Sequence, residues 1–471
     1  MKFLNEILSA IPVELAIDHP THQIAVSGIT LDSRNVKPGD IFAAVKGLSV
    51  DGHRFIPDAI ENGAVAILGD REENFDLAVP YLKANNTREA LAYIAAALAD
   101  FPARKLTVIG VTGTDGKTTT STILHHILRQ AGLKAGLITT VSAIIGENEL
   151  DTGFHVTTPE VVDVQHYLSL MVAAGMTHVV LETTSHGLAQ HRVTGCEFDI
   201  GIITNITHEH LDYHGSYEEY RAAKGRLFTE LSAPHKHPKT ISPVGVLNMD
   251  DPGSYPYLDA ITQAKKVTYA VKNPTADFTA FDVTQTPQGM AFTLRYQQEE
   301  NRLETKLIGR YNIANILAAF SAAVAGLGVS PKIAAQAIAT LPGVPGRMEV
   351  IDMGQDFTAI VDFAHTPNAL KMALETLKDF PNGKVWAVFG SAGLRDRQKR
   401  AMMGAVAAQY ADYSIFTAED PRTESLEGIL ENMANAARSK GGLEGSSFWR
   451  IPDRGSAIQF AVEHAAPGDI V

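Results

Sequence analysis

The sequence is poor in cysteine and in long apolar runs. Cys196 is the single cysteine among 471 residues, which excludes an internal disulfide and a cysteine zinc site and fits a reducing compartment. No apolar run approaches the roughly 18 residues that a membrane-spanning helix needs. The N-terminal segment lacks the basic region and long apolar core of a signal peptide. We therefore expect a cytoplasmic protein with no membrane contact.

Basic residues are also scarce. Lys and Arg number 40 against 53 Asp and Glu, which gives a net charge of −13. A nucleic-acid partner requires a basic face, so this class of partner is excluded, whereas a local basic site could still hold an anionic substrate. The hydrophobic content of 45% supports sizeable cores. At about 150 residues per domain, the length predicts about three domains.

The chain is organised around residues 105–120, KLTVIGVTGTDGKTTT. An apolar strand leads into a turn with Gly113 and Gly116, and a helical pattern follows. The N–H groups at a helix start can cradle phosphates, Lys117 can reach terminal phosphates, and the Thr118 hydroxyl can bind Mg²⁺. Val111 stands where the strict motif has glycine, so this is a variant phosphate loop that predicts nucleotide binding.

Hydrophobic periodicity divides the chain into three α/β units. In residues 1–103 we predict helices at 1–11, 59–64 and 86–98 and strands at 41–45 and 64–68. Two polar loops carry Ser33, Arg34, Asp51 and His53. These residues either stabilise the turns or anchor a ligand. Residues 104–340 alternate strands with helices, which predicts a mostly parallel sheet covered on both faces. Its strands are expected at 106–111, 136–140, 177–182, 200–205 and 244–248, with an antiparallel extension at 267–307.

The third unit, residues 341–471, reads as a second small α/β sheet. Strands are predicted at 350–362, 385–390 and 413–417, and helices at 368–378, 397–410 and 425–439. Residues 467–471 have the pattern of a turn entering a strand, and we expect this unit to be incomplete.

Several polar residues follow the predicted strands of the central unit, where nucleotide sites of such sheets lie. Glu182 is placed to hold Mg²⁺, with a solvated loop residue as the alternative. Residues 207–214, THEHLDYH, contain three histidines, of which we expect one to be functional and two to be capping or surface residues. Lys224 adjoins an apolar helical stripe that includes Tyr220, and by itself it would be a snorkelling surface lysine.

Two further groups lie later in the chain. Asn312 and Asn315 stand at the start of a predicted helix, where one could cap the helix and the other could read a purine edge. Arg395, Asp396, Arg397, Lys399 and Arg400 form a charged cluster that either holds an anion or is a solvated helix start.

Taken in order, these pieces resemble the Mur ligase family and, within it, the MurE type, over essentially the whole chain. The motifs that carry the resemblance are Asp32-Ser33-Arg34, Gly47–Gly52, Gly113–Thr119, Thr157-Thr158-Pro159, Ser185–Leu188, His210–Gly215, Ala223-Lys224, Asn312 and Asn315, Pro345–Glu349, Asp362, Ala364–Pro367, Arg395-Asp396 and Asp420–Arg422. The resemblance implies three α/β domains: a UDP-binding domain (1–103), a central P-loop parallel-sheet ATPase domain (104–340) and a C-terminal Rossmann-like domain (341–471).

The resemblance also implies an activity. Such a protein is an ATP-dependent, ADP-forming ligase of peptidoglycan biosynthesis, expected as a monomer, which joins a free diamino acid to UDP-N-acetylmuramoyl-L-alanyl-D-glutamate. The substrate carboxylate would attack the γ-phosphate of ATP, and the amine would then attack the acyl phosphate. Lys117, Mg²⁺ and Arg347 would offset the developing charge.

The family's site residues carry over onto matching positions. The UDP anchor would be Leu31, Ser33, Leu48, Ser49 and Val50, and the muramoyl-peptide would contact Thr157, Thr158, Thr184, Gln190 and Arg192. ATP would be held by Gly113, Thr114, Asp115, Gly116, Lys117, Thr118 and Thr119 together with Asn315, Arg347 and Asp362. Two magnesium ions would involve Thr118, Glu182, His210 and Lys224, the last as a carbamate, N6-carboxylysine. Lys117, Lys224, His210 and Arg347 would be the catalytic residues, and Arg395, Asp420 and Arg422 would contact the incoming amino acid.

Some positions depart from the family pattern. The late Gly-Lys-Gly-His-Glu segment is not in the sequence, and Asp115 replaces a usual asparagine in the phosphate loop. We expect the Asp115 side chain to cap the turn and point away from the nucleotide.

The departure at Asp420 bears on the amino acid. Diaminopimelate enzymes usually have asparagine there, and an aspartate would repel a distal carboxylate and attract an ammonium. The sequence therefore favours L-lysine or L-ornithine, with meso-diaminopimelate as the alternative. A folylpolyglutamate-synthetase-like ligase and a non-catalytic Mur-ligase-like subunit are further alternatives.

Overall fold

The computed structural model describes residues 2–47, 50–72, 77–140, 142–151, 158–207, 209, 211–233, 237, 239, 241–286, 288–378, 380, 383–394 and 397–471, with the main chain alone at 151, 211 and 212. The chain forms two compact units. The first comprises Met1–Ala280, Leu294–Glu300 and Ala314–Ile338, and the second comprises Phe281–Thr293, Asn301–Ile313 and Ala339–Val471.

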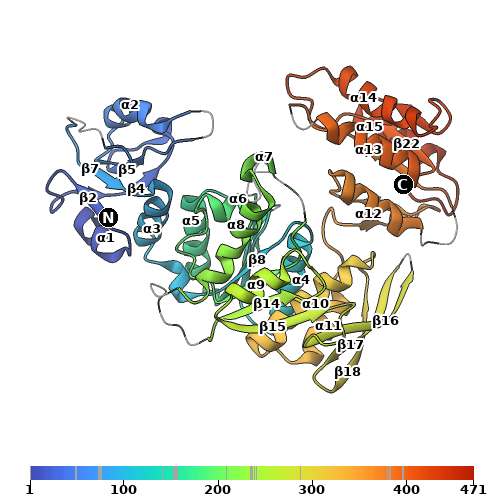
Figure 1. Ribbon diagram of the computed structural model, residues 1–471, viewed down its shortest axis with the longest axis horizontal. Helices are drawn as coiled ribbons and strands as arrows, with labels where there is room; N and C mark the ends of the chain where they lie inside the picture. Colours follow the sequence, from blue (N-terminus) through green and yellow to red (C-terminus); the bar gives the residue numbers. More distant parts are fainter. Residues whose placement is uncertain are drawn as a thin grey trace. The chain divides into compact units, whose positions relative to one another are not determined.

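The N-terminal part of the first unit is a five-stranded sheet in the order β2-β7-β6-β5-β4 (Figure 1). β4 to β7 run parallel, and β2 pairs antiparallel with β7. Asn86 caps the helix α3, because its Oδ1 accepts from the N–H groups of Arg88 and Glu89. The elements are β1 Lys2–Phe3, α1 Leu4–Ala10, β2 Leu15–Ile17, β3 Ala25–Val26, β4 Gly28–Thr30, η1 Ser33–Asn35, β5 Asp40–Ala43, η2 Gly52–Phe55, α2 Ile56–Glu61, β6 Ala66–Gly69, β7 Tyr81–Ala84 and α3 Thr87–Leu98.

The central sheet has the strand order β11-β10-β9-β12-β8-β13-β14-β15-β16-β17-β18. Strands β9 to β16 of this order pair in parallel, as the alternation of strands and helices predicted, with β8 in the middle between β12 and β13. The strands are β8 Thr107–Thr112, β9 Ala135–Ile138, β10 Ser142–Ile145, β11 Asn148–Asp151, β12 His178–Glu182, β13 Ile200–Ile203, β14 Val244–Asn248, β15 Lys265–Ala270, β16 Phe278–Thr286, β17 Gly289–Tyr296 and β18 Glu299–Thr305.

Helices follow these strands, and α4 and α8 lie near β8 in Figure 1. Helix α5 packs against α3, which joins the N-terminal part to the central part within the first unit. The helical elements are η3 Pro102–Lys105, α4 Lys117–Gln130, α5 Val161–Ala173, α6 Ser185–Ala189, α7 Leu211–His214, α8 Tyr217–Glu230, α9 Tyr255–Ile261, α10 Tyr311–Ser321, the π-helical turn η4 Ala322–Gly326, and α11 Pro331–Thr340.

The second unit has a three-stranded parallel sheet, β21-β22-β23, and a separate antiparallel pair, β19 and β20. Its core gathers apolar side chains of α12, α13, α14 and the sheet, such as Leu374, Met403, Phe416 and Met433. The elements are β19 Glu349–Ile351, β20 Ala359–Val361, α12 Pro367–Lys378, β21 Trp386–Phe389, α13 Arg397–Tyr410, β22 Tyr413–Phe416, α14 Leu426–Ser439, β23 Phe448–Arg450 and α15 Arg454–His464.

The structure corrects several predicted elements. The apolar run at 350–362 is two strands, because Asp352 and Gly354 turn the chain back between them. Strands β15 and β16 are parallel rather than part of an antiparallel extension. The hairpin β10–β11, the strand β23 and the helix α15 were not predicted from the sequence. Pairing of Ile470 with Thr358 and Val385 agrees with the strand expected at the end of the chain.

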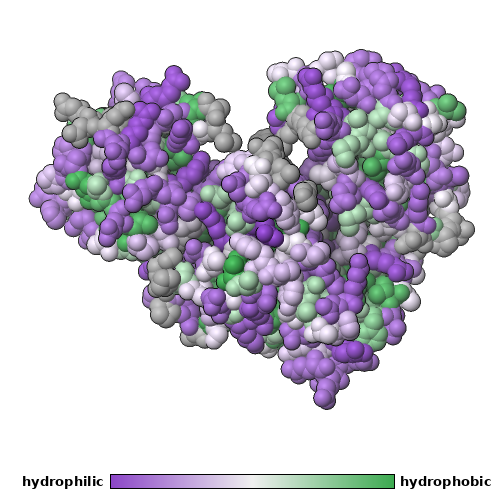
Figure 2. Space-filling view, in the orientation of Figure 1, coloured by the Kyte–Doolittle hydropathy of each residue, from purple (hydrophilic) through white to green (hydrophobic). Residues whose placement is uncertain are grey.

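The surface visible in Figure 2 is largely hydrophilic, with hydrophobic residues in small separate groups. Among the described helices, none is both long enough and apolar enough to cross a membrane.

Candidate functional site

The phosphate loop connects β8 to α4, and its two glycines are required by close contacts. Gly113 and Gly116 both have positive φ, 152° and 82°. A Cβ at Gly113 would lie 1.8 Å from Thr204 Oγ1, and one at Gly116 would lie 2.2 Å from Asn315 Oδ1. The loop therefore closes tightly over β13 on one side and places Asn315 beside Gly116 on the other.

Helix α4 begins at Lys117, and its N-cap residue is Gly116, which has no side chain to cap the helix. The N–H groups at a helix start can bind an anion, and the helix dipole favours one there. Lys117 Nζ donates to the carbonyls of Thr114 at 2.8 Å and Gly113 at 3.2 Å, so the ammonium is held at the loop. These features suit the phosphates of a nucleotide.

The turn at Asp115 is held through its main chain. Its N–H donates to Asn205 Oδ1 at 3.0 Å, and its carbonyl accepts from Thr204 Oγ1 at 2.6 Å and from Asn205 Nδ2 at 3.3 Å. Among the described residues, none bonds to the Asp115 carboxylate, so the side-chain cap that we expected is not seen. Thr204 and Asn205, which follow β13, hold the turn instead.

Glu182 ends β12 and is 1% exposed, which rules out a solvated loop residue. Its carboxylate accepts from Thr118 Oγ1 at 3.0 Å and from Thr140 Oγ1 at 3.2 Å. Within the described part of the chain, these neutral donors and the Thr140 N–H are its hydrogen-bond partners, and it forms no ion pair. A buried carboxylate without a cation is costly. Together with the Thr118 hydroxyl it offers the hard oxygen ligands that Mg²⁺ takes, so these two residues fit a magnesium ion.

Lys224 is also buried, at 2% exposure, so it is not a surface lysine. Its Nζ donates to the Gly113 carbonyl at 2.6 Å, the same carbonyl that Lys117 contacts. Burial, reinforced by the nearby charge of Lys117, holds the pKa of Lys224 well below its usual value. The structure thus places a long, easily neutralised amine against the phosphate loop.

The histidine-rich segment is described in part, because His208 and His210 lie outside the described residues. His214 is 7% exposed, so it is not a surface residue, one of the two roles expected for the histidines that are not functional. Its ring packs against the rings of His186, Tyr213 and Tyr220 at centroid distances of 5.4, 4.8 and 5.3 Å. No group of three or more His, Cys, Asp or Glu side chains suited to a metal is found among the residues that the structure describes.

Four predicted substrate contacts come together beside Glu182. Thr158 Oγ1 lies 3.0 Å from Thr184 Oγ1 and donates to the Glu182 carbonyl at 3.4 Å. Arg192 donates to the Thr158 carbonyl at 2.7 Å and to Gln190 Oε1 at 3.0 Å. The fifth predicted contact, Thr157, lies outside the described residues.

The predicted UDP anchors lie around α2. Ser33, in η1, is buried, and its carbonyl accepts from Asn62 Nδ2 at 3.0 Å. Leu31 packs on the N-terminal core, and Val50 is 44% exposed in the loop before η2. Both η1 and η2 pack on α2. Leu48 and Ser49 lie outside the described residues.

In the second unit, a tight turn presents Arg347. Asp362 accepts from the N–H groups of Met348 at 2.8 Å and Ala364 at 2.9 Å, and Met348 has φ of 48°. The Arg347 guanidinium lies 4.7 Å from the ring centre of Phe363. Asn312 donates to the Ile308 carbonyl at 2.8 Å, so it braces the turn before α10.

Two of the three predicted amino-acid contacts, Asp420 and Arg422, lie in the loop after β22. Arg422 donates to Asp420 through its N–H at 3.2 Å and its Nε at 3.4 Å, so the Asp420 charge has a local partner. Arg400 is 1% exposed and pairs with Glu424 at 2.6 Å, which lowers the pKa of Glu424 to about 2. The charged cluster is therefore partly structural. Arg395 and Asp396 lie outside the described residues.

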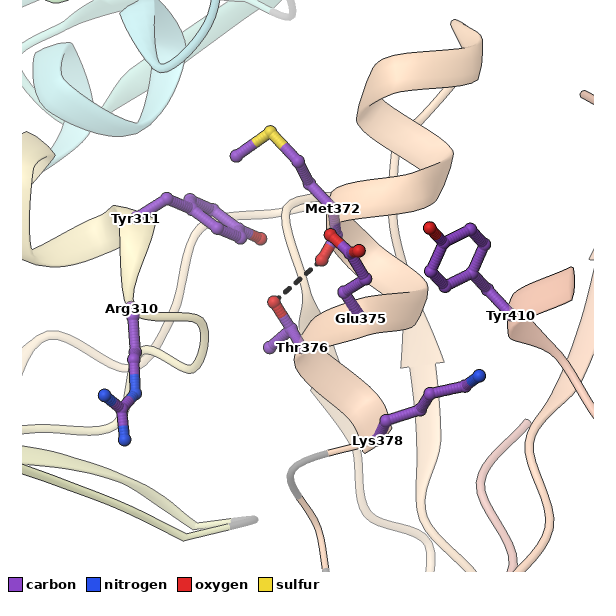
Figure 3. Close-up of a pocket in the computed structure, with 7 residues that line it drawn as sticks. All are labelled: Arg310, Tyr311, Met372, Glu375, Thr376, Lys378 and Tyr410. Atoms are coloured by element: carbon purple, nitrogen blue, oxygen red, sulfur yellow. Dashed lines mark hydrogen bonds between the residues drawn. The ribbon is translucent and has the colours of Figure 1, made fainter. Parts of the chain in front are cut away.

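A hollow of about 510 Å³ lies elsewhere in the second unit, between the start of α10, α12 and the end of α13. Figure 3 shows the side chains that line it. Its lining mixes both charges with aromatic and apolar groups: Arg310, Tyr311, Met372, Glu375, Thr376, Lys378 and Tyr410. None of the predicted site residues lines it.

Sequence reasoning included Asn205, in the segment 205–210 after a predicted strand, but missed three other residues of the site. Thr204 and Tyr220 brace the phosphate loop and Thr140 contacts Glu182. Thr140 and Thr204 carry no motif, and Tyr220 belongs to an apolar stripe. The sequence signal that was available is position, because all but Tyr220 follow the carboxyl ends of strands next to β8 or β12.

Comparison with known families matches three models along the chain. The Mur ligase family catalytic domain matches residues 25–102, the Mur ligase middle domain matches 111–323, and the Mur ligase glutamate ligase domain matches 346–471. A ligase of Geobacillus thermodenitrificans (strain NG80-2), named UDP-N-acetylmuramoyl-L-alanyl-D-glutamate–2,6-diaminopimelate ligase, is 42% identical over 95% of this chain and 88% of its own. The chain belongs to the Mur ligase family.

Further relatives place this Mur ligase in the MurE type. The UDP-N-acetylmuramyl-tripeptide synthetase of Deinococcus radiodurans is 41% identical over 99% of this chain and 93% of its own. A solved structure titled as a UDP-N-acetylmuramoyl-L-alanyl-D-glutamate–2,6-diaminopimelate ligase superposes with a TM-score of 0.70 at 32% identity, over 100% of this chain and 92% of the other. The three-domain α/β fold and the ATP-dependent, ADP-forming ligase class expected from the sequence are thereby confirmed. The domain boundaries and site residues stay predictions.

Proposed function

We propose that this Mur ligase uses ATP to join meso-diaminopimelate to UDP-N-acetylmuramoyl-L-alanyl-D-glutamate. The observation that carries the proposal is the junction at Glu182. Its carboxylate accepts from Thr118 at the start of α4, and its carbonyl accepts from Thr158 of the substrate group. Groups suited to a nucleotide and to an acceptor substrate thus meet at one residue, as transfer between two bound substrates requires.

The chain's own residues have separable tasks in this reaction. The start of α4 and Lys117 bind phosphate oxygens, and Arg192 and Thr184 orient the muramoyl-peptide. The D-glutamyl carboxylate forms a bond to the γ-phosphorus as the bond to ADP breaks. The deprotonated amine then bonds to the acyl carbon, and phosphate leaves. Arg347 would offset negative charge at the phosphoryl group.

Thr118 and Glu182 would hold magnesium, which supplies positive charge to the phosphates. We propose further that Lys224 is carbamylated, and that His210 joins it at a second magnesium. Burial against the Gly113 carbonyl supports this role, because a neutral amine can add carbon dioxide and lose a proton, which converts it into an anionic oxygen ligand.

The choice of amino acid rests on two opposing arguments. Asp420 as a bare carboxylate would favour lysine or ornithine. Its contacts with Arg422 compensate part of that charge and weaken the repulsion of a distal carboxylate. The names of the relatives at 42% and 32% identity specify diaminopimelate, which favours this substrate.

The test measures ADP release and product mass with the full chain, UDP-N-acetylmuramoyl-L-alanyl-D-glutamate, and each of meso-diaminopimelate, L-lysine and L-ornithine. We expect ADP release to require both substrates, with kcat/KM for diaminopimelate at least tenfold above the other two. Arg422→Gln should lower kcat/KM for diaminopimelate, whereas Asp420→Asn should raise it. A preference for lysine or ornithine would contradict the choice of diaminopimelate and would indicate that the charge of Asp420 selects the amino acid. ADP release without either substrate would indicate a generic nucleotidase.

A further inference from the structure

Tyr220 lies where the phosphate loop meets α8. It is 0% exposed, and its hydroxyl lies 2.9 Å from Thr114 Oγ1. The Thr114 hydroxyl in turn accepts from the Thr207 N–H at 2.9 Å. One side chain of the loop is thus tied both to α8 and to the segment after β13.

The ring of Tyr220 makes a second contact with the site. Lys224, one turn further along α8, places its Nζ 4.6 Å from the ring centre while donating to the Gly113 carbonyl. The aromatic face attracts a cation, and it forms a wall that limits the positions open to the lysine. The same ring therefore borders the residue that contacts the first glycine of the loop.

The Tyr220 ring also packs on an aromatic group beside the predicted substrate contacts. His214 meets it at 5.3 Å, His214 packs on Tyr213, and Gln190 donates to the Tyr213 hydroxyl at 3.0 Å. Packing alone would need a phenyl ring and no hydroxyl. The Tyr220 hydroxyl lies within hydrogen-bond distance of Thr114, and packing of the ring alone does not explain this contact.

We propose that Tyr220 is a positioning residue of the nucleotide site, which fixes Thr114 through its hydroxyl and Lys224 through its ring. The inference rests on the proposed nucleotide site. Tyr220 touches no reacting atom in this role. It sets the shape of the loop before the nucleotide arrives, so that binding does not have to order it.

The experiment measures ADP binding by calorimetry in the presence of Mg²⁺ for the full chain and for Tyr220→Phe, Thr114→Val and the double variant. Loss of one buried hydrogen bond predicts about 5- to 10-fold weaker ADP binding in either single variant. Both variants remove the bond between Tyr220 and Thr114, and Thr114→Val also removes the acceptor of the Thr207 N–H. The double variant should therefore bind ADP about as weakly as Thr114→Val alone. Tyr257→Phe is the matched control, since its ring packs on another face of α8, at Gly225, and it should leave the affinity unchanged.

Steady-state kinetics gives a second readout. Tyr220→Phe should raise KM for ATP several-fold and leave KM for the UDP-linked substrate within twofold, which a general loss of packing would not do. Wild-type affinity for ADP in Tyr220→Phe, or additive losses in the double variant, would overturn the inference. Absence of ADP binding by the wild-type chain would instead overturn the nucleotide site on which it rests.

Discussion

Replacing Glu182 by glutamine separates the folding role of this residue from its proposed metal role. The carboxylate accepts three hydrogen bonds, from Thr118 Oγ1 and the Thr140 N–H on one oxygen and from Thr140 Oγ1 on the other. A carboxamide oxygen can keep the first two. Its NH₂ can donate to the Thr140 hydroxyl, which can rotate to accept.

The expected change in folding stability is therefore small. Three hydrogen bonds persist in neutral form, and a buried charge that has no ion-pair partner among the described residues disappears, so these two effects oppose each other. We expect a free energy of unfolding within about 1 kcal/mol of wild type, or a Tm shift of about 2–4 °C at most. Metal-dependent catalysis should respond differently, because a neutral amide is a poor substitute for an anionic ligand of Mg²⁺.

The assay is ADP release at saturating substrates over a magnesium titration, with thermal melting of the same samples. Loss of one charged contact at the reacting phosphate predicts a fall of about 10²- to 10³-fold in kcat, about 2.7–4 kcal/mol. Glu299→Gln, at an exposed position of β18, is the matched control and should change neither quantity. Glu182→Gln with more than a third of wild-type kcat, or with a Tm lowered by more than about 8 °C, would refute this reasoning.

Three further predictions follow from the contacts described above. Gly116→Ala should abolish measurable ADP binding, because its Cβ would collide with Asn315 Oδ1, whereas Gly132→Ala has a similar positive φ with open space around it and should bind ADP normally. Asp115→Asn should leave KM for ATP unchanged or lower it, because the turn is held through main-chain bonds; a tenfold loss of activity would contradict this. The salt bridge from Arg400 lowers the pKa of Glu424 to about 2, so its contribution to stability is complete above the ordinary pKa near 4.5 and is lost as pH falls towards 2. Glu424→Gln should flatten that part of the stability profile in acid melts.

The sequence predicted the parallel core of the central sheet and the phosphate loop because both depend on local pattern. Apolar runs of strand length followed by helical periodicity define β8 and α4, and glycines mark the loop between them. Helix α13 was predicted with its observed bounds, Arg397–Tyr410. The division of residues 350–362 into β19 and β20 was not predicted, because an apolar stretch with a polar centre also fits one continuous strand.

What the sequence by itself determined is the set of chemical groups at the site: a phosphate loop, an acid that follows a strand, a lysine in a helix, and the Mur ligase motifs around them. Tertiary structure alone decided which groups meet. Thr114 and Tyr220 are 106 positions apart, and Thr118 and Glu182 are 64 apart. Such pairs form because β12, β8 and β13 are neighbours in the sheet, an order that hydrophobic periodicity does not encode. Burial of Lys224 and Glu182 likewise depends on how helices cover that sheet, which is why a lysine that resembles a surface residue in sequence lies against the phosphate loop.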